Sequence, residues 1–443
     1  AATFSERMSD ISRQLIKDVY GGQSLVDSLL NRDLRDYLDK GRNINGKLEA
    51  SAFMPLKRFG DHKSNMLFEA VADYKNSKSD RFNRFKINYG NDMSHYDMAS
   101  QYFKGHPDHD IRAGLSARFA QYIKGSNHID FKYGYEYVEA RRTSLLYMLD
   151  RIDGFDASQA PLGYLPSMTQ YAPCIDGSQS YYSMFKEHKN VFTPRYIGVL
   201  TISQTSFLNV DCSVPVELSH RTYDYYKQPS GDVTKLSPFA ALPGFVGNMY
   251  LSLNPKGGWG IRSTLNMQAS PRKANMHDMI DLYDDTNPLN IRLGNPDLKN
   301  AYVVNMSLNT TFSKKGVRRT HRVQASYRNL INEFARGYIY NPETGVRTFR
   351  TYNVNGNWDV NGLYEFFAPF GKYNKFDVNV STSGTYRNSI DLVGSSAIDA
   401  FAIPPRRRVN TLTIGEAVKF NWTTGKNRLS ADADVRVNRY TSP

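Results

Sequence analysis

Residues 429–438 read Leu-Ser-Ala-Asp-Ala-Asp-Val-Arg-Val-Asn, with an apolar side chain at every odd position and a polar one at every even position. Successive side chains of a β-strand point to opposite faces of its sheet. This stretch therefore predicts a strand with one apolar face and one polar face.

The same alternation restarts along the chain in about fourteen segments, with clear examples at residues 208–218, 302–312 and 412–422. Short turns that contain Gly, Asn and Lys join the segments in pairs, as β-hairpins require. Long connections of about 15–40 residues separate most of the pairs. The pattern predicts an all-β protein, an antiparallel up-and-down transmembrane β-barrel with a polar interior and a lipid-facing exterior.

The bulk composition is compatible with this barrel. The mean hydropathy is −0.54, and the sequence has no apolar run long enough for a transmembrane helix. In a transmembrane barrel only every second strand residue meets lipid, so a negative mean hydropathy does not exclude membrane residence.

The formal net charge of +13 raises the alternative of nucleic-acid binding. The basic residues are scattered through predicted strands and turns, and no nucleic-acid motif is present, so we expect no nucleic-acid partner. A cationic lumen, or attraction to lipopolysaccharide or anionic substrates, explains the charge equally well. Arg406–Arg408, placed in a predicted loop, are either a contact for lipopolysaccharide phosphates or a flanking run of charge.

The two cysteines are expected to be unpaired thiols. Cys174 lies in a long connection and Cys212 on the apolar face of a predicted strand, so they are not expected within bridging distance. Their separation matches no metal-binding spacing.

The chain divides into two predicted parts. Residues 1–44 have leucines at helical spacing (Leu25, Leu29, Leu30, Leu34, Leu38) and are expected to form a partly helical segment in an extracellular loop or to belong to an upstream domain. Residues 45–443 form the barrel. No signal peptide is visible in the given sequence, although a barrel of this class needs one. The strand at residue 429 runs outward, so we expect a fragment of a larger barrel.

Two soluble folds fit the sequence less well than the barrel does. A soluble antiparallel sheet with one buried face also alternates, but a sandwich fits long loops at one end poorly. A propeller requires a repeated blade signature, which the sequence lacks.

The stretch from Leu293 to Asn300, Leu-Gly-Asn-Pro-Asp-Leu-Lys-Asn, resembles the Gly-Asn-Pro-x-Leu-Lys-Pro-Glu signature of TonB-dependent outer-membrane receptors. Asn300-Ala301 depart from it where the family often has Pro-Glu. The matching family-motif residues are Gly294, Asn295, Pro296 and Leu298. Residues 353–358 resemble the outer-membrane β-barrel subfamily of these receptors, and the resemblance covers most of residues 45–440, as barrel only.

The resemblance implies a 22-strand barrel plugged by an N-terminal domain that contacts TonB. Neither plug nor TonB box is found in this sequence, so contact with TonB is expected only through a missing plug domain. The implied location is the outer membrane of a Gram-negative bacterium, in contact with its lipid and lipopolysaccharide.

Candidate ligand-binding residues gather in the predicted loop over residues 270–300. Asp281, Asp284 and Asp285 lie near Arg292, where they could contact an unidentified extracellular ligand or simply be solvated; their spacing does not match a calcium loop. Tyrosines that could form an interfacial girdle are Tyr133, Tyr135, Tyr137, Tyr223 and Tyr225. Alternation assigns Asp377, Asn379, Asp432, Asp434 and Arg436 to the lumen.

No catalytic constellation, metal site or cofactor motif is found, so we expect neither an enzyme nor a cofactor. The sequence predicts the barrel of a TonB-dependent receptor-like protein that takes up a nutrient such as a siderophore, glycan or peptide. The alternative is a plug-free structural or adhesive barrel whose loops bind extracellular partners.

Overall fold

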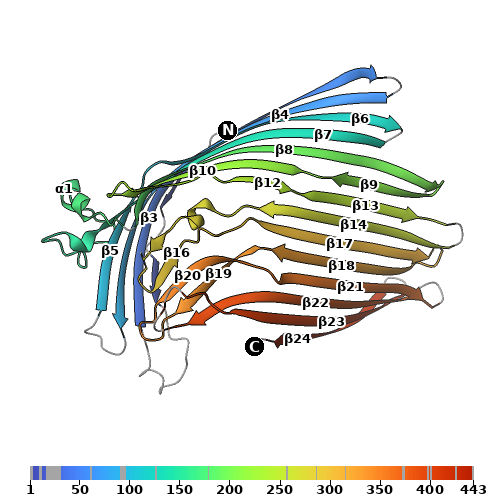
Figure 1. Ribbon diagram of the computed structural model, residues 1–443. Coiled ribbons are helices and arrows are strands. Elements are labelled where there is room, and N and C mark those ends of the chain that lie inside the picture. Colours follow the sequence, from blue (N-terminus) through green and yellow to red (C-terminus); the bar gives the residue numbers. More distant parts are fainter. Residues whose placement is uncertain are drawn as a thin grey trace.

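In the computed structural model the chain forms one large curved antiparallel sheet with a small second sheet at one end (Figure 1). The structure describes residues 3–8, 12–15, 31–59, 62–89, 96–124, 127–177, 179–255, 258–285, 287–314, 316–371, 375–396, 399, 402–424 and 427–441.

The large sheet consists of long strands that follow one another in chain order, each antiparallel to the next. They are β3 (Asn31–Phe59), β4 (His62–Tyr89), β6 (Asp108–Lys124), β7 (Asn127–Met148), β8 (Ser180–Ser203), β9 (Ser206–Ser213) continued by β10 (Val216–Gln228), β12 (Phe239–Pro243) continued by β13 (Phe245–Leu253), β14 (Trp259–Arg272), β17 (Ala301–Lys314), β18 (Arg319–Ile331), β21 (Asn357–Phe370), β22 (Phe376–Ser395), β23 (Arg406–Thr424) and β24 (Asn427–Thr441). Counting the two interrupted strands once each, these are the about fourteen strands that the alternation predicts, and the predicted all-β antiparallel fold is confirmed.

Shorter elements lie at the end of the sheet where the long connections are (Figure 1). β5 (Tyr96–Lys104) pairs with β4 and β7, and β11 (Val233–Leu236) pairs with β10. The second sheet contains β15 (Tyr283–Asp284), β16 (Asn290–Leu293), β19 (Glu333–Tyr340) and β20 (Arg347–Val354). The helices are short: η2 (Leu149–Arg151), α1 (Met168–Tyr171), η3 (Ala172–Cys174) and η4 (Met276–Met279). Within the described ranges, no helix has the length and apolar character needed to cross a membrane.

The predicted helical character of residues 1–44 is wrong for the part that the structure describes. β1 (Thr3–Met8) and β2 (Ser12–Leu15) pair with β3, which itself begins at Asn31. Leu38 is buried against Phe82 and Tyr102 of neighbouring strands, because pairing of β3 with β4 overrides the local spacing of leucines. The proposed boundary after residue 44 falls inside β3. Leu25, Leu29 and Leu30 lie outside the described residues, and the extracellular position of this segment stays a prediction.

The predicted short turns join neighbouring strands at one end of the sheet. Phe59 pairs with His62, Lys124 with Asn127, and Thr424 with Asn427. The turn at residues 341–345 is different, since it joins β19 to β20 at the end with long connections. Arg406–Arg408 begin β23 opposite residues 390–392 and are not in a loop, because their backbone continues the β22 pairing.

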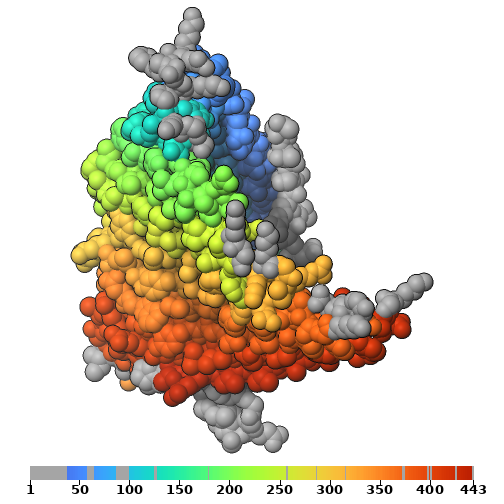
Figure 2. Space-filling model, turned by 90° about the vertical axis from the view of Figure 1, so that its right-hand side faces the viewer, coloured from blue at the N-terminus to red at the C-terminus, as the bar shows by residue number. Residues whose placement is uncertain are grey.

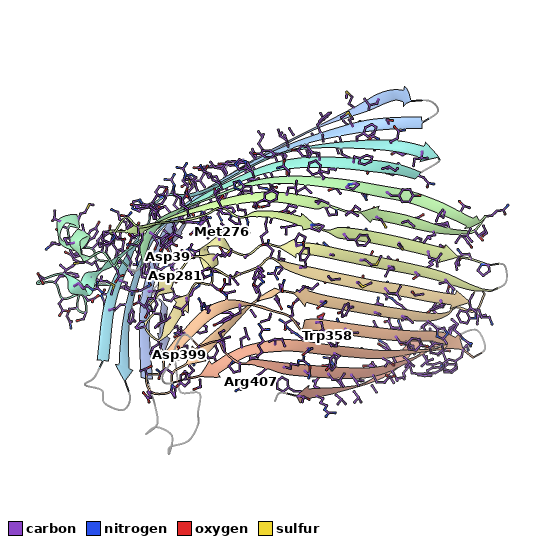
Figure 3. All side chains as sticks on the ribbon, viewed as in Figure 1. Asp39, Met276, Asp281, Trp358, Asp399 and Arg407 are labelled. Atoms are coloured by element: carbon purple, nitrogen blue, oxygen red, sulfur yellow. The ribbon has the colours of Figure 1, made fainter. Side chains whose placement is uncertain are left out.

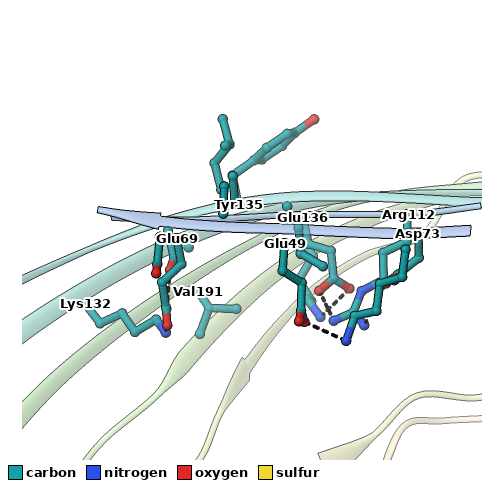
Figure 4. Close-up of a pocket in the computed structure, with 18 residues that line it drawn as sticks. Glu49, Glu69, Asp73, Arg112, Lys132, Tyr135, Glu136 and Val191 are labelled. Carbon is teal, nitrogen blue, oxygen red and sulfur yellow. Dashed lines mark hydrogen bonds and ion pairs between the residues drawn. The ribbon is translucent and has the colours of Figure 1, made fainter. Parts of the chain in front are cut away.

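The large sheet has two chemically distinct faces, as the alternation predicts. On β7, Phe131 and Tyr133 point to one face while Lys132 and Glu136 point to the other, and Figure 4 shows Tyr135 on the opposite side from Lys132 and Glu136. The apolar face leaves large side chains exposed, including Leu115 at 65% and Phe131 at 56%. Asp377 and Asn421 hydrogen-bond on the polar face of β22 and β23.

Only part of the predicted tyrosine girdle lies on the apolar face. Tyr133, Tyr135 and Tyr137 do, beside Phe192 and His188 of β8. Tyr223 and Tyr225 do not, because the β10–β8 register turns them to the polar face, where they are buried. For these two residues the girdle assignment is wrong.

Among the described residues, both cysteines are free thiols, as predicted. Cys212 lies on the apolar face opposite Tyr196 of β8, and Cys174 lies in η3. β24 pairs with β23, and β3 pairs with β1, β2 and β4; no pairing in the described ranges joins β24 to β3. Figure 2, turned from the first view, shows the colours of the large sheet following one another from blue to red.

Candidate functional site

The polar face carries ion pairs on five strands, β3, β4, β6, β7 and β8. Those of β4, β6, β7 and β8 are joined into one network. It borders a hollow of about 660 Å³ (Figure 4). At its centre Glu136 accepts hydrogen bonds from Arg112 Nη2 at 2.7 Å and from Lys189 Nζ at 2.8 Å. One carboxylate therefore joins β6, β7 and β8.

Further pairs extend this network along the strands. Glu69 Oε2 lies 2.8 Å from Lys132 Nζ and 2.9 Å from Ser116 Oγ. Arg195 binds Asp211 through two nitrogens, at 2.7 and 2.6 Å. Half-exposed pairs of this kind stabilise a fold by at most about 1 kcal/mol each. Their main consequence here is a strongly hydrophilic surface of mixed charge.

At the end with long connections, the segment from Lys273 to Asn300 folds against the polar face. Figure 3 labels Met276 and Asp281 at this end of the molecule. Met276, Ile280 and Leu282 are almost fully buried and pack against Tyr223 and Tyr225 of β10. Burial of three apolar side chains of this size stabilises the docked segment by several kcal/mol, at about 1.5–3 kcal/mol each.

Hydrogen bonds fix the start of this segment. The Asn275 side chain accepts from the His277 backbone N–H at 3.1 Å and so caps η4. The Tyr223 hydroxyl lies 2.8 Å from His277 Nδ1. Burial is the largest cause that lowers the pKa of His277, and the nearby Arg292 charge lowers it further. A neutral imidazole therefore faces Tyr223 at neutral pH.

The four predicted ligand-binding residues are spread along the docked segment. Arg292 forms an ion pair with Asp278, and Asp284 is opposite Arg292 in the β15–β16 pair. Asp285 accepts from Gln179 Nε2 at 3.2 Å, whereas Asp281 is exposed. In the described part of the chain, no group of three or more His, Cys, Asp or Glu residues could hold a metal ion. A role of these four residues in ligand binding stays a prediction.

The motif residues 293–300 connect the docked segment to the β19–β20 hairpin. Asn295 Nδ2 donates to the Thr351 carbonyl at 2.8 Å, and Arg350 Nε donates to the Gly294 carbonyl at 2.8 Å. A Cβ on Gly294 would lie 1.8 Å from the Ile280 carbonyl oxygen, so this position requires glycine. Leu298 is buried. The motif therefore holds two neighbouring loops together.

A second hollow of about 510 Å³ lies under the docked segment, between residues 273–277 and the polar face of β8 and β10. Its polar lining includes Arg221, Lys273 and Glu187. None of these three residues is among those predicted from the sequence. Their only signal is the alternation of β10, which places Glu217, Ser219, Arg221, Tyr223 and Tyr225 on one face.

Residues 244–437 match the model of the outer membrane protein beta-barrel family. Over these residues the chain is similar to outer-membrane β-barrel proteins, and its antiparallel sheet with one apolar and one polar face is the fold of such a barrel. The predicted location in the outer membrane of a Gram-negative bacterium is thereby confirmed, and so is the predicted resemblance to outer-membrane β-barrel proteins. The apolar face of the sheet faces lipid, and the polar face with its ion pairs lines the lumen.

Solved outer-membrane proteins are similar to this chain at low sequence identity. The outer membrane transporter YddB of Escherichia coli is 10% identical, with a TM-score of 0.31, over 87% of this chain and 63% of YddB. The unliganded ferric citrate transporter FecA is 11% identical, with a TM-score of 0.36, over 93% of this chain and 65% of FecA. The copper transporter OprC is 10% identical, with a TM-score of 0.38, over 98% of this chain and 72% of OprC.

This outer-membrane barrel chain spans less than two thirds of the lengths of YddB and FecA. A search of curated protein sequences found no match.

Proposed function

We propose that the chain forms the lumen wall and mouth of an outer-membrane receptor that takes up a nutrient. The nutrient would be a siderophore, a glycan or a peptide, with TonB acting through a plug domain. The observation that carries the proposal is the ion-pair network on the lumen face, centred on Glu136 between Arg112 and Lys189.

The network supports uptake because it offers a hydrophilic surface along the strands within the membrane. Mixed charges can exchange hydrogen bonds with a polar solute or with a polar plug surface. Outer-membrane barrels in general have a polar interior, and that interior is a water-filled channel in some and is plugged in others.

The mouth supports capture of a ligand before uptake. The segment 273–300 is docked on β8 and β10, and the motif joins it to the β19–β20 hairpin. Both are connections at the end of the sheet that outer-membrane barrels expose to the outside.

The test is uptake by cells that express the complete native protein containing this chain. A deletion strain would be complemented with the wild-type gene, and radiolabelled ferric citrate, maltoheptaose and a hexapeptide would be supplied separately. We expect one of these to accumulate in complemented cells, and accumulation to stop when TonB is deleted. Surface binding of cells to matrix proteins, without accumulation of any of the three solutes, would overturn the proposal in favour of the adhesive barrel.

A substitution on the lumen face tests whether the ion-pair network acts in transport or only helps the barrel to form. Glu136→Gln leaves Arg112 and Lys189 without their shared carboxylate and should change the uptake rate several-fold. The matched control is Glu416→Gln, which changes the same side chain on the lipid-facing side of the wall, and uptake should stay at the wild-type rate.

A further inference from the structure

The hollow under residues 273–277 has the features of a built ligand site. It lies on the lumen side of the wall at the mouth, and its lining combines basic with aromatic side chains. Residues Lys273 to His277 cover it, and this cover is fixed by the packing of Met276 on Tyr223.

Arg221 is the unusual group in this hollow. Its side chain projects from β10 and the residue is only 4% exposed. Nη1 donates to the Ala274 carbonyl at 2.7 Å, but Nε is buried without a hydrogen-bond partner. Glu187, opposite Arg221 on β8, and Glu217 act on this charge from a distance, but neither forms a hydrogen bond with it among the described residues. A buried guanidinium with an unsatisfied N–H is costly, and an incoming carboxylate would relieve that cost.

The other charged groups of the hollow already have partners. Lys273 Nζ binds Glu187 and lies 2.7 Å from Glu217 Oε1. Arg142 Nη2 lies 2.5 Å from Asp110 Oδ1. Glu187 also accepts from Ser219 Oγ at 2.6 Å. Arg221 feels the charges of Glu187 and Glu217 but forms no ion pair with them among the described residues, so the unsatisfied Nε of its guanidinium is the group left for a ligand.

Aromatic rings form another side of the hollow. The rings of Tyr181 and His277 are 5.4 Å apart, and His277 is held by the Tyr223 hydroxyl. Phe185 lies beside them in the lining. Flat faces of this kind stack on an aromatic ligand.

We propose that this hollow binds a small aromatic carboxylate, with the carboxylate on Arg221 and the ring beside Tyr181 and His277. An Arg guanidinium binds a carboxylate through two parallel hydrogen bonds donated from one of its edges. The unpaired Nε of Arg221 lies on such an edge. This inference rests on the proposed function: if the protein is an uptake receptor, the bound acid is the solute that it captures, or a part of that solute.

The test is binding of 4-hydroxybenzoate to the complete native protein, purified in detergent, measured by calorimetric titration. The neutral isostere 4-hydroxybenzamide has the same ring without the charge. We expect the amide to bind about tenfold more weakly or worse, because hydrogen bonds to charged groups contribute about 1.5–3 kcal/mol. Equal affinities for the acid and the amide would overturn the proposal.

Arg221→Gln should weaken binding of the acid by about tenfold and leave binding of the amide unchanged. The matched control is Arg322→Gln, which removes an equal charge on the lumen face of β18, where Arg322 pairs with Glu365. Loss of binding in both variants would show general attraction by the lumen charge and would contradict a specific site.

A measurement on the unaltered protein covers the case in which Arg221→Gln does not fold. Diethyl pyrocarbonate modifies histidine, and 4-hydroxybenzoate should protect His277 from it while the amide does not. Unprotected His277 at a saturating acid concentration would overturn the proposal. Binding without uptake of any solute contradicts only the proposed function, whereas uptake without binding of the acid contradicts only this site.

Discussion

Asn353 and Lys299 hold each other by two reciprocal hydrogen bonds, although 54 residues separate them in the chain. Asn353 Oδ1 accepts from the Lys299 backbone N–H at 2.7 Å, and its Nδ2 donates to the Lys299 carbonyl at 2.9 Å. The same Nδ2 donates to the Asn332 carbonyl at 2.7 Å. One amide thus joins the end of the motif, the end of β20 and the residue after β18.

Asn353→Ala should release the motif from the β19–β20 hairpin. At about 0.5–1.5 kcal/mol for each hydrogen bond, we expect a local loss of about 1–3 kcal/mol. The measurement is the rate of limited proteolysis within residues 293–300. Asn266→Ala, which removes a single bond to Ser307 on β17, is the control and should leave this rate unchanged; equal rates in wild type and Asn353→Ala would contradict the role of Asn353.

Gly294→Ala should disrupt the docked segment. The added methyl would meet the Ile280 carbonyl oxygen at 1.8 Å, and overpacking of this kind costs about 1–3 kcal/mol or more. Gly362→Ala on β21, where a Cβ meets nothing within 4 Å, is the matched control. Hydrogen exchange of residues 276–282 should become faster only in Gly294→Ala, and unchanged exchange there would show that the contact is relieved at little cost.

Glu416 lies on the lipid-facing side of β23 opposite Val435 of β24, between Ile414 and Val418. A carboxyl side chain facing lipid destabilises a barrel, so Glu416→Leu should raise the free energy of unfolding by about 1–2 kcal/mol. Urea titration of the complete protein in lipid vesicles measures this change. The control is Thr411→Leu, on the lumen face of the same strand, which should not raise the free energy of unfolding. A Glu416→Leu protein that is less stable than the wild type would indicate that Glu416 has a partner in the membrane.

Acid should loosen the docked segment, because the pKa of His277 is lowered in the folded protein. Burial is the main cause, Arg292 adds to it, and Asp278 and Asp284 oppose it. A His with a lowered folded pKa stabilises the fold above its ordinary pKa of about 6.5, and that stability is lost as the pH falls toward the folded value. The rate of proteolysis within residues 273–282 should therefore rise below about pH 6.5. His277→Gln should remove most of this pH dependence. If the pH profile of His277→Gln is the same as that of the wild type, the pH dependence comes from other groups.

The sequence by itself determined the repeating unit of this protein. Alternation at residues 429–438 follows from the strand pleat, which is local covalent geometry, so the two faces of β24 could be derived without any distant contact. The same holds for tight turns such as that between Thr424 and Asn427, whose residue types fit a hairpin.

Tertiary structure decided where several other residues lie and which of them form a candidate site. Leu34 and Leu38 have helical spacing, yet they lie in β3 because ladder pairing with β4 extends to Asn31. The sequence pattern predicts Tyr223 and Tyr225 as girdle residues. In the structure they are covered by Met276, which lies more than 50 positions later in the chain. Arg221 became a candidate site only when residues 273–277 folded over it. These outcomes depend on which distant segments bury each other's surfaces, and the local alternation of a strand carries no information about them.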